Sequence, residues 1–328
     1  MSDRIRLGIV GYGNLGRGVE AAIAQHDDLE LVGIFTRRDP ATITPLGRRV
    51  DVHHVDDIGA LADGIDVVVA CGGSKTDLPE QVPELVAHCC VVDSYDTHAK
   101  ISEYFAAVEA AARAAGTLAI ISTGWDPGLF SLNRLFGEAI LPAGQTATFW
   151  GRGVSQGHSD AVRRVPGVAA GVQYTEPIPA AIDAVRSGTR PELTPGTSHT
   201  RSCFVVLEDD ADPDAVRAAI VGMPDYFAPY DTTVTFVDAE ELAADHGAMP
   251  HGGVVIRSGT TADEADHTIE YRLQLGHNPS FTASVLVAYA RAAHRLALRG
   301  ETGARTVFDV APGLLSPRSS AELRRDLL

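Results

Sequence analysis

The chain has 328 residues, a formal net charge of −16 at pH 7 and a hydrophobic fraction of 45%. This length favours two or three domains, and the negative charge argues against nucleic acid as a partner. There is no run of about 18 apolar residues and no apolar leader near Met1, so we expect no membrane association and a cytoplasmic location.

Residues 4–122 alternate between short apolar runs and stretches with helical spacing. The expected strands cover residues 5–10, 29–35, 66–70, 91–92 and 118–121, and the expected helices cover residues 14–24 and 98–115. Apolar strands that alternate with helices are typical of a parallel sheet covered on both faces. The sequence therefore predicts an α/β fold with a Rossmann-type, doubly wound parallel sheet.

The pattern changes after about residue 145. Residues 268–275 alternate between polar and apolar side chains, residues 233–237 do so over a shorter stretch, and both are interpreted as strands of an antiparallel sheet. Residues 188–198 are rich in Pro, Gly and Thr and are expected to form a surface loop. A helix from Asn278-Pro279 to about Arg299 is expected, because Pro is favoured at the first helical position.

These patterns divide the chain into two domains. We expect a dinucleotide-binding domain over residues 1–122, joined by a C-terminal return segment over about residues 280–328. Residues 123–279 are expected to form a substrate-binding and dimerisation domain of the α+β class, built on a mixed or antiparallel sheet.

Glycines recur in Gly11-Tyr12-Gly13-Asn14-Leu15-Gly16, between the first expected strand and the first expected helix. In that context the first glycine permits a tight turn, the second lets the backbone approach a pyrophosphate, and the third permits helix–strand packing. The helix N-terminus then presents N–H groups to the phosphates. A plain glycine turn is the alternative interpretation.

The second expected strand ends in Thr36-Arg37-Arg38. An NAD enzyme commonly has Asp or Glu at this point to bind the ribose 2′-hydroxyl. A hydroxyl and two guanidinium groups instead suit a 2′-phosphate, which accepts bidentate, charge-assisted hydrogen bonds. An ordinary solvated arginine pair is the alternative, and we predict NADP as the cofactor.

Polar or glycine-rich clusters follow three of the expected strands. They are Cys71-Gly72-Gly73-Ser74, Asp93-Ser94-Tyr95-Asp96-Thr97-His98 and Ser122-Thr123-Gly124-Trp125-Asp126-Pro127-Gly128. Ligands of doubly wound sheets bind outside the carboxyl ends of the strands, so these clusters are expected to surround the reacting groups. Asp96 and Asp126 could hold an ammonium group or accept its proton. Asp126, just before Pro127, is equally well interpreted as a helix N-cap.

Other candidate chemistries find less support. The three adjacent residues His158-Ser159-Asp160 cannot form a nucleophilic triad, and a glycine-rich segment that orders around substrate is a better interpretation of residues 149–160. The four cysteines lack CxxC spacing, and the histidines, including His246 and His251, lack metal-ligand spacing. We therefore expect free thiols and no metal.

A set of motifs is spread along nearly the whole chain, at residues 10–17, 122–128, 149–151, 155–161, 223–227, 249–253, 278–279 and 281–284. Through these motifs the chain resembles the meso-diaminopimelate dehydrogenase family over nearly its whole length. Two features depart from the family pattern: Gly72 replaces a bulkier residue, and residues 38–57 match poorly. These departures put the cofactor affinity in doubt more than the substrate.

The resemblance implies reversible, NADP-dependent oxidative deamination of meso-2,6-diaminopimelate at its D-centre. The products are L-2-amino-6-oxopimelate and ammonia, and the reverse reaction leads toward lysine and peptidoglycan. The resemblance also implies a homodimer whose interface lies outside the nucleotide domain. Asp126, or Asp96 through a water molecule, is the expected proton acceptor.

The resemblance assigns contacts residue by residue. The expected cofactor contacts are Gly11, Tyr12, Gly13, Asn14, Leu15, Thr36, Arg37, Arg38, Cys71, Gly72, Gly73, Ser74, Ser94, Tyr95, Asp96, Asp126, Pro127, Gly128, Leu129 and Phe130. The expected substrate contacts are Asp96, Trp125, Asp126, Trp150, Gln156, Gly157, Thr175, Arg201, His251 and Asn278.

Three alternatives remain for comparison. Sugar and inositol oxidoreductases usually carry a Glu-Lys-Pro motif after the fifth strand, where this chain has Asp93-Ser94-Tyr95-Asp96. Dihydrodipicolinate reductases carry a paired-histidine and lysine motif that is missing here. A catalytically silent NADP sensor would not need so many polar residues at its strand ends.

Overall fold

The computed structural model describes residues 4–47, 50–262 and 265–328, which form two compact units. Unit 1 comprises residues 1–132 and 279–328, and unit 2 comprises residues 133–278. The expected domain boundaries lie near residues 122 and 280. In the structure the first division falls between residues 132 and 133, inside helix α5 (Leu129–Ile140). Among the described residues, no helix combines the length and apolarity needed to cross a membrane.

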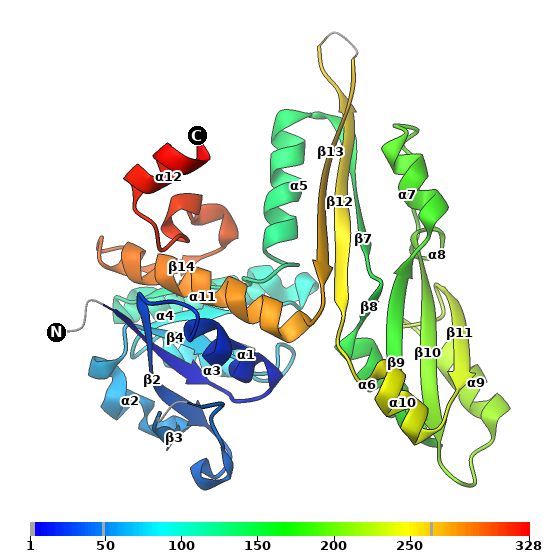
Figure 1. Cartoon of the computed structure of the whole chain (residues 1–328), viewed down its shortest axis with the longest axis horizontal. Helices are drawn as coiled ribbons and strands as arrows, with labels where there is room; N and C mark the ends of the chain where they lie inside the picture. Colours follow the sequence, from blue (N-terminus) through cyan, green and yellow to red (C-terminus); the bar gives the residue numbers. More distant parts are fainter. Residues whose placement is uncertain (1–3, 48–49, 263–264) are drawn as a thin grey trace. The chain divides into compact units, whose positions relative to one another are not determined.

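Unit 1 contains a seven-stranded sheet in the order β14-β6-β5-β4-β1-β2-β3, and each adjacent pair is parallel (Figure 1). The strands are β1 (Ile5–Val10), β2 (Leu29–Thr36), β3 (Val52–His54), β4 (Val67–Ala70), β5 (Cys90–Asp93), β6 (Leu118–Ile120) and β14 (Gly303–Arg305). The helices are α1 (Asn14–Ile23), α2 (Ile58–Leu61), α3 (Leu78–Leu85), α4 (Ile101–Ala115), α11 (Asn278–Ala297) and α12 (Ser320–Leu327). The predicted doubly wound parallel sheet is confirmed.

The two faces of this sheet have separate hydrophobic cores. In β4, Val67 and Val69 join one core, whereas Val68 joins the other, because successive side chains of a strand point to opposite faces. Val19 of α1 and Leu286 of α11 belong to the first core, so α11 packs in unit 1 with the N-terminal strands and helices. Residues of α3 and α4 complete the second core. This arrangement leaves the carboxyl ends of β1, β4, β5 and β6 along one edge.

Unit 2 contains two sheets. One has the order β11-β10-β9-β8 and the other the order β13-β12-β7. The strands are β7 (Ala143–Trp150), β8 (Gly153–Val154), β9 (Val168–Pro177), β10 (His199–Leu207), β11 (Asp231–Phe236), β12 (His251–Thr260) and β13 (Asp266–Leu275). The helices are α6 (Gln156–Arg163), α7 (Pro179–Arg186), α8 (Pro195–Ser198), α9 (Pro213–Val221) and α10 (Ala239–His246).

The structure corrects the expected pairing of residues 233–237. Strand β11 pairs parallel with β10, whereas β9 pairs antiparallel with both β8 and β10, so this sheet is mixed. Helix α9 lies between β10 and β11 in the sequence. It provides the crossover connection that two parallel strands need. The expected loop at residues 188–198 also contains the short helix α8.

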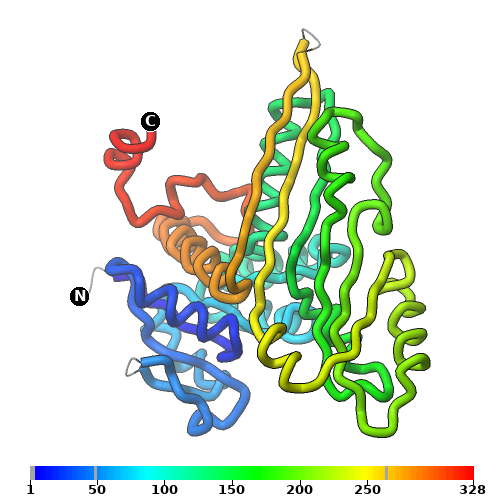
Figure 2. Tube along the Cα trace, turned by 45° about the vertical axis from the view of Figure 1, so that its right-hand side comes forward, coloured from blue at the N-terminus to red at the C-terminus, as the bar shows by residue number. Residues whose placement is uncertain are grey.

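The β13-β12-β7 sheet is antiparallel throughout, and β12 and β13 form a long hairpin (Figure 2). Alternation along β13 is as expected, because Thr268, Glu270 and Arg272 are exposed while Ile269 and Tyr271 are half-buried. Helix α5 covers the face that carries Thr146 and Thr148, which are opposite Arg257 and Val255 in the register. Helix α7 packs against the other face through Val185.

Candidate functional site

The glycine loop joins β1 to α1 at the carboxyl edge of the unit 1 sheet. Gly11 has φ +90° and donates its N–H to the Phe35 carbonyl oxygen at 2.8 Å. A Cβ on Gly16 would lie 2.2 Å from the Gly11 carbonyl oxygen, so helix and turn are in direct contact there. A Cβ on Gly13 would meet no atom within 4 Å among the described residues, apart from its own chain neighbours. The loop therefore leaves its open side at the glycine where a pyrophosphate would approach the backbone.

Tyr12 and Glu20 fasten this loop to the first helix. The buried Tyr12 hydroxyl donates to the Glu20 carboxylate, which also accepts the Leu46 N–H at 3.0 Å. Burial and the Glu20 hydrogen bond raise the pKa of Tyr12 to about 12, so its hydroxyl stays protonated. Sequence reasoning missed Glu20, although a carboxylate beside Val19 on the buried side of an amphipathic helix is a usable signal.

The arginines after β2 lie close to two of the expected cofactor loops. Arg38 donates from Nη2 to the Tyr12 carbonyl oxygen at 2.7 Å, and Arg37 forms a 2.9 Å ion pair with Asp77. Both side chains are exposed, whereas Thr36 is buried and its hydroxyl oxygen accepts the Arg38 N–H at 3.1 Å. Two guanidinium groups are thus held at the end of β2, where a 2′-phosphate would be bound.

Asp77 is a second residue that sequence reasoning missed. Its Oδ2 accepts the Gly73 N–H at 2.9 Å, so the carboxylate that pairs with Arg37 also shapes the loop after β4. These contacts hold the pKa of Asp77 below its ordinary value against the effect of burial. The side chain of Gln81 lies next to Gly72, and a Cβ there would approach Gln81 Oε1 to 2.7 Å. A larger residue at position 72 would therefore require the side chains of Gln81 and Asp77 to shift.

The loops after β4, β5 and β6 meet through two polar residues. The Ser74 hydroxyl oxygen accepts the Asp96 N–H at 2.8 Å, which joins two of the expected cofactor loops. Asp93 is fully buried and accepts from Tyr95 N–H at 2.8 Å, Ser122 N–H at 2.9 Å and the Tyr104 hydroxyl at 2.6 Å. Burial raises the pKa of Asp93 to about 6. Asp93 therefore organises the strand ends, while Asp96 remains exposed.

The segment around Asp126 forms a compact turn before α5. The N–H groups of Leu129 and Phe130 donate to the carbonyl oxygens of Gly124 at 3.0 Å and Trp125 at 2.8 Å. Trp125 is buried and packs edge-on against Phe130. Because α5 begins at Leu129, Asp126 lies outside its N-cap position, which weakens the capping interpretation. Asp126 is half-buried.

In unit 2, the register of neighbouring strands aligns several expected substrate residues in one row. Thr175 of β9 is opposite Gly153 of β8 on one side and Arg201 of β10 on the other. A Cβ on Gly153 would lie 2.4 Å from the His251 ring, so His251 continues the row. The Asn278 N–H donates to the Met249 carbonyl oxygen at 2.9 Å, close to the same segment. The structure therefore brings Thr175, Arg201 and His251 together.

Arg201 is the buried cation of this row. Its side chain is only 6% exposed, donates from Nη1 to the Thr175 hydroxyl oxygen and lies 4.0 Å from the centre of the Tyr230 ring. Among the described residues no carboxylate forms an ion pair with it, and burial lowers the pKa of Arg201. A buried guanidinium without a counter-ion is costly unless a ligand provides the anion.

Two histidines flank Arg201 and are held neutral. Burial first, and the charge of Arg201 second, lower the pKa of both His158 and His199 to about 4. His199 accepts the backbone N–H of Trp150 at 2.9 Å, and its ring stacks on the indole of the same residue, which is 38% exposed. His158 contacts the Ser155 hydroxyl at 2.8 Å. Sequence reasoning missed His199, a histidine on the buried phase of an alternating strand.

The remaining residues of segment 155–160 lie at the start of α6. Gln156 and Gly157 are the first residues of this helix and both are exposed. Outside the helix itself, no atom of the described residues lies within 4 Å of a Cβ placed on Gly157. Asp160 pairs with Arg163 rather than with His158. The structure thus leaves an accessible helix start beside the Arg201 row and supports no nucleophilic triad.

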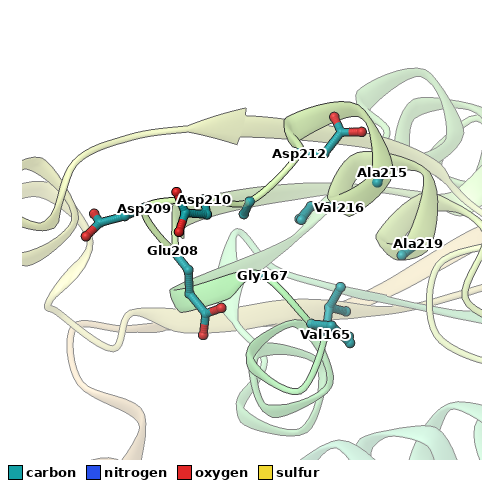
Figure 3. A pocket seen from close by; sticks show the side chains of 11 residues that line it. Val165, Gly167, Glu208, Asp209, Asp210, Asp212, Ala215, Val216 and Ala219 are labelled. Carbon is teal, nitrogen blue, oxygen red and sulfur yellow. The ribbon is translucent and has the colours of Figure 1, made fainter.

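An acidic pocket elsewhere in unit 2 has a different character. Its volume is about 600 Å³, and it is lined by Glu208, Asp209, Asp210 and Asp212 above apolar residues such as Val216. Figure 3 shows these carboxylates pointing in different directions instead of toward a common centre. Within the described part of the chain, no group of three or more His, Cys, Asp or Glu residues could hold a metal ion. None of the expected site residues lines this pocket.

The sheet, the open glycine and the paired arginines define the class of the NADP-dependent oxidoreductases. Residues 124–277 match the family model described as the diaminopimelic acid dehydrogenase C-terminal domain. A meso-diaminopimelate D-dehydrogenase of Ureibacillus thermosphaericus is 59% identical over 326 residues, which are 99% of this chain and 100% of the relative. The chain belongs to the meso-diaminopimelate D-dehydrogenase family.

Two solved structures are similar over the full length. The C. glutamicum diaminopimelate dehydrogenase in complex with DAP is 47% identical, with full coverage of both chains and a TM-score of 0.92. An engineered D-amino acid dehydrogenase bound to NADP⁺ is 46% identical, with a TM-score of 0.87 and coverage of 99% of this chain and 100% of that one. Both the predicted family and the predicted cofactor are therefore confirmed.

Proposed function

We propose that this protein catalyses the reversible, NADP-dependent oxidative deamination of meso-2,6-diaminopimelate at its D-centre. The products are L-2-amino-6-oxopimelate and ammonia, and the reverse reaction supplies precursors of lysine and peptidoglycan. The observation that supports this function best is Arg201, a buried cation with no carboxylate partner among the described residues. A substrate with two carboxylates supplies the missing anion.

The glycine loop and the residues after β2 hold NADP. Gly11 and Gly16 fix the turn, and the open side of Gly13 admits the pyrophosphate. Arg37 and Arg38 bind the 2′-phosphate, for which Arg37 exchanges part of its contact with Asp77. The other cofactor contacts are Tyr12, Asn14, Leu15, Thr36, residues 71–74, residues 94–96 and residues 126–130. Bound NADP⁺ would supply the hydride acceptor, and the residues around it would set its distance and face.

The charged groups of the substrate require two sets of partners, and the chain has both. In unit 2, Arg201 forks a carboxylate, with Thr175 and His251 beside it in the same row. Trp150, Gln156, Gly157 and Asn278 complete this set. In unit 1, Asp96 and Asp126 bind the ammonium group at the reacting carbon, and Trp125 completes this second set.

The reaction removes a hydride from the D-carbon and a proton from its nitrogen, and water then adds to the resulting C=N bond before ammonia leaves. Asp126, or Asp96 through a water molecule, accepts the proton from nitrogen. Asp96 is exposed and can pass the proton to solvent, whereas Asp126 is half-buried. This difference in exposure favours Asp126 as the residue that contacts the substrate.

One assay tests the proposed function. NADP⁺ reduction is followed with meso-, L,L- and D,D-diaminopimelate in parallel, together with Asp96→Asn and Asp126→Asn. We expect turnover with the meso isomer and none with the L,L isomer, and a loss of at least about a hundredfold in kcat for one of the two variants. Activity on sugars alone would disprove the function. Near-normal turnover in both variants would exclude these carboxylates as proton acceptors.

We further propose a cytoplasmic homodimer that associates through unit 2. Leu135, Phe136 and Ile140 of α5 are 44%, 48% and 64% exposed, and the half-buried Ile269 and Tyr271 of β13 lie on the sheet face that α5 covers. Exposed apolar side chains that gather on one face are typical of an interface. The four cysteines are free thiols, as a reducing compartment requires.

A further inference from the structure

Gln173 of β9 is fully buried, yet neither atom of its side-chain amide has a hydrogen-bond partner. The Nε of Arg201 is likewise buried and unpaired. In the described residues, five buried side-chain polar atoms lack a partner, and three of them belong to these two residues. Buried polar atoms are rarely left unpaired, so this concentration at one point calls for an explanation.

The sheet register places the two side chains together. Thr175 is opposite Arg201, and Gln173 is opposite Cys203, so Gln173 and Arg201 occupy diagonal positions on the same face. Such diagonal neighbours lie about 7 Å apart, within reach of two long side chains. The Arg201 side chain is held from other directions, because it donates to Thr175 and lies against Tyr230.

The backbone of Gln173 is also anchored to Ser155 and Ser159, at the start of α6. Its N–H donates to the Ser159 hydroxyl oxygen at 3.0 Å, and its carbonyl oxygen accepts the Ser155 N–H at 3.2 Å. Ser159 in turn donates to the Ser155 carbonyl oxygen at 2.7 Å. These contacts hold Gln173 beneath the start of α6, so its amide cannot reach solvent.

We propose that Gln173 is a positioning residue for Arg201, and that one buried water molecule joins the Gln173 amide to Arg201 Nε. Buried waters typically form about three hydrogen bonds, and the unpaired atoms here are one acceptor and two donor groups. With Nε held in this way, the outer edge of the guanidinium is oriented toward the substrate carboxylate. This inference rests on the proposed function of Arg201.

The experiment compares Gln173→Met, Gln173→Glu and the control Gln25→Met. Met matches the length of Gln without its polar atoms, and Gln25 is an exposed residue at the end of α1, outside the proposed site. For Gln173→Met we expect the KM for meso-diaminopimelate to rise about tenfold, because losing one hydrogen bond to a charged group weakens binding by about this factor. The kcat, the KM for NADP⁺ and the melting temperature should remain near those of the wild type and of Gln25→Met.

Gln173→Glu places a carboxylate beside Arg201 and should raise the same KM further, because it neutralises the guanidinium. A Gln173→Met enzyme with a KM within twofold of the wild type would overturn the proposal, as would a Gln173→Glu enzyme that binds substrate normally. If Gln173 had only a structural role, Gln173→Met would have a lower melting temperature and an unchanged KM. That result would also contradict the proposal.

A crystal structure of the wild type gives a test that does not depend on any variant. A water molecule within hydrogen-bond distance of both Gln173 and Arg201 Nε is expected, and its absence would disprove the bridge. An inactive wild type would instead contradict the proposed function, so the two failures are distinguishable.

Discussion

Gly16 lies directly against the main chain of Gly11, and a Cβ at position 16 would come within 2.2 Å of the Gly11 carbonyl oxygen. In the described part of the chain, no atom beyond the adjacent residues lies within 4 Å of a Cβ at Gly13, two residues beyond Gly11 in the same loop. The glycines at positions 13 and 16 are therefore required for different reasons. Gly16 serves the packing of α1 on the turn, and Gly13 serves the approach of the cofactor.

This difference predicts opposite outcomes for two alanine variants. Gly16→Ala should lower the free energy of unfolding by about 2–3 kcal/mol, the cost of forcing a methyl group into a packed site. Gly13→Ala should leave the free energy of unfolding within about 0.5 kcal/mol but raise the KM for NADP⁺ at least about tenfold. Urea unfolding and steady-state kinetics measure the two quantities. Equal destabilisation of both variants would contradict the assignment.

The arginine pair determines the choice between NADP and NAD. Arg37→Ala combined with Arg38→Ala removes two charge-assisted contacts to the 2′-phosphate and should raise the KM for NADPH about a hundredfold. The KM for NADH, which lacks that phosphate, should change less than about threefold. Asp77→Asn is the matched control, because it frees Arg37 without removing its charge. Equal effects on both cofactors would show that the pair is only a solvated surface feature.

Arg201 combines a cost in stability with a gain in binding. Arg201→Met removes a buried cation that has no anionic partner in the described chain, so the free energy of unfolding should not fall and should rise by about 1 kcal/mol. The same change should raise the KM for meso-diaminopimelate about a hundredfold. Thermal unfolding and kinetics together test the pair of effects. A stable variant with normal substrate affinity would remove Arg201 from the site.

Most of unit 1 could be predicted from the sequence because its central strands are continuous apolar runs. Helix α3 was missed because Pro83 lies inside it, and the edge strands β3 and β14 are only three residues long. The parallel pairing of β11 was also missed, because polar and apolar alternation indicates which side chains are buried but not the direction of the strand.

The candidate site shows the same limit. The glycine loop and the arginine pair follow local patterns, whereas Asp77, Asp93 and Glu20 act through partners far away in the sequence. Arg201 was named only through the family resemblance. A local signal existed, because Arg201 shares the buried phase of β10 with Cys203 and Val205. A single arginine on the buried side of a strand indicates an internal cation and suggests an anionic ligand.

The two neutral histidines predict how stability depends on pH. The pKa values of His158 and His199 fall from 6.5 to about 4 on folding, so the unfolded chain takes up these protons first as the pH decreases. The contribution of these two neutral histidines to the free energy of unfolding is complete above pH 6.5 and is lost as the pH falls toward 4. Between pH 7 and pH 5, each histidine should lower the free energy of unfolding by about 2 kcal/mol.

His199→Gln tests this dependence, because glutamine can still accept the Trp150 N–H but does not titrate. The loss of stability between pH 7 and pH 5, measured by urea unfolding, should be about 2 kcal/mol smaller than in the wild type. Gln25→Met, a change between two residues that do not titrate at an exposed position, should follow the wild-type curve. An unchanged pH dependence in His199→Gln would contradict a depressed pKa for this residue.

The exposed apolar residues of α5 predict the oligomeric state. A charge at Phe136 or Ile140 would have to be buried in the proposed interface, so Phe136→Glu with Ile140→Glu should convert a dimer into a monomer. Light scattering after size-exclusion chromatography measures the mass, and circular dichroism confirms that the monomer is folded. Leu298→Glu, at a 75% exposed position of unit 1, is the matched control and should leave the mass unchanged. A wild-type monomer, or a double variant that remains dimeric, would show that this face of α5 is not the interface.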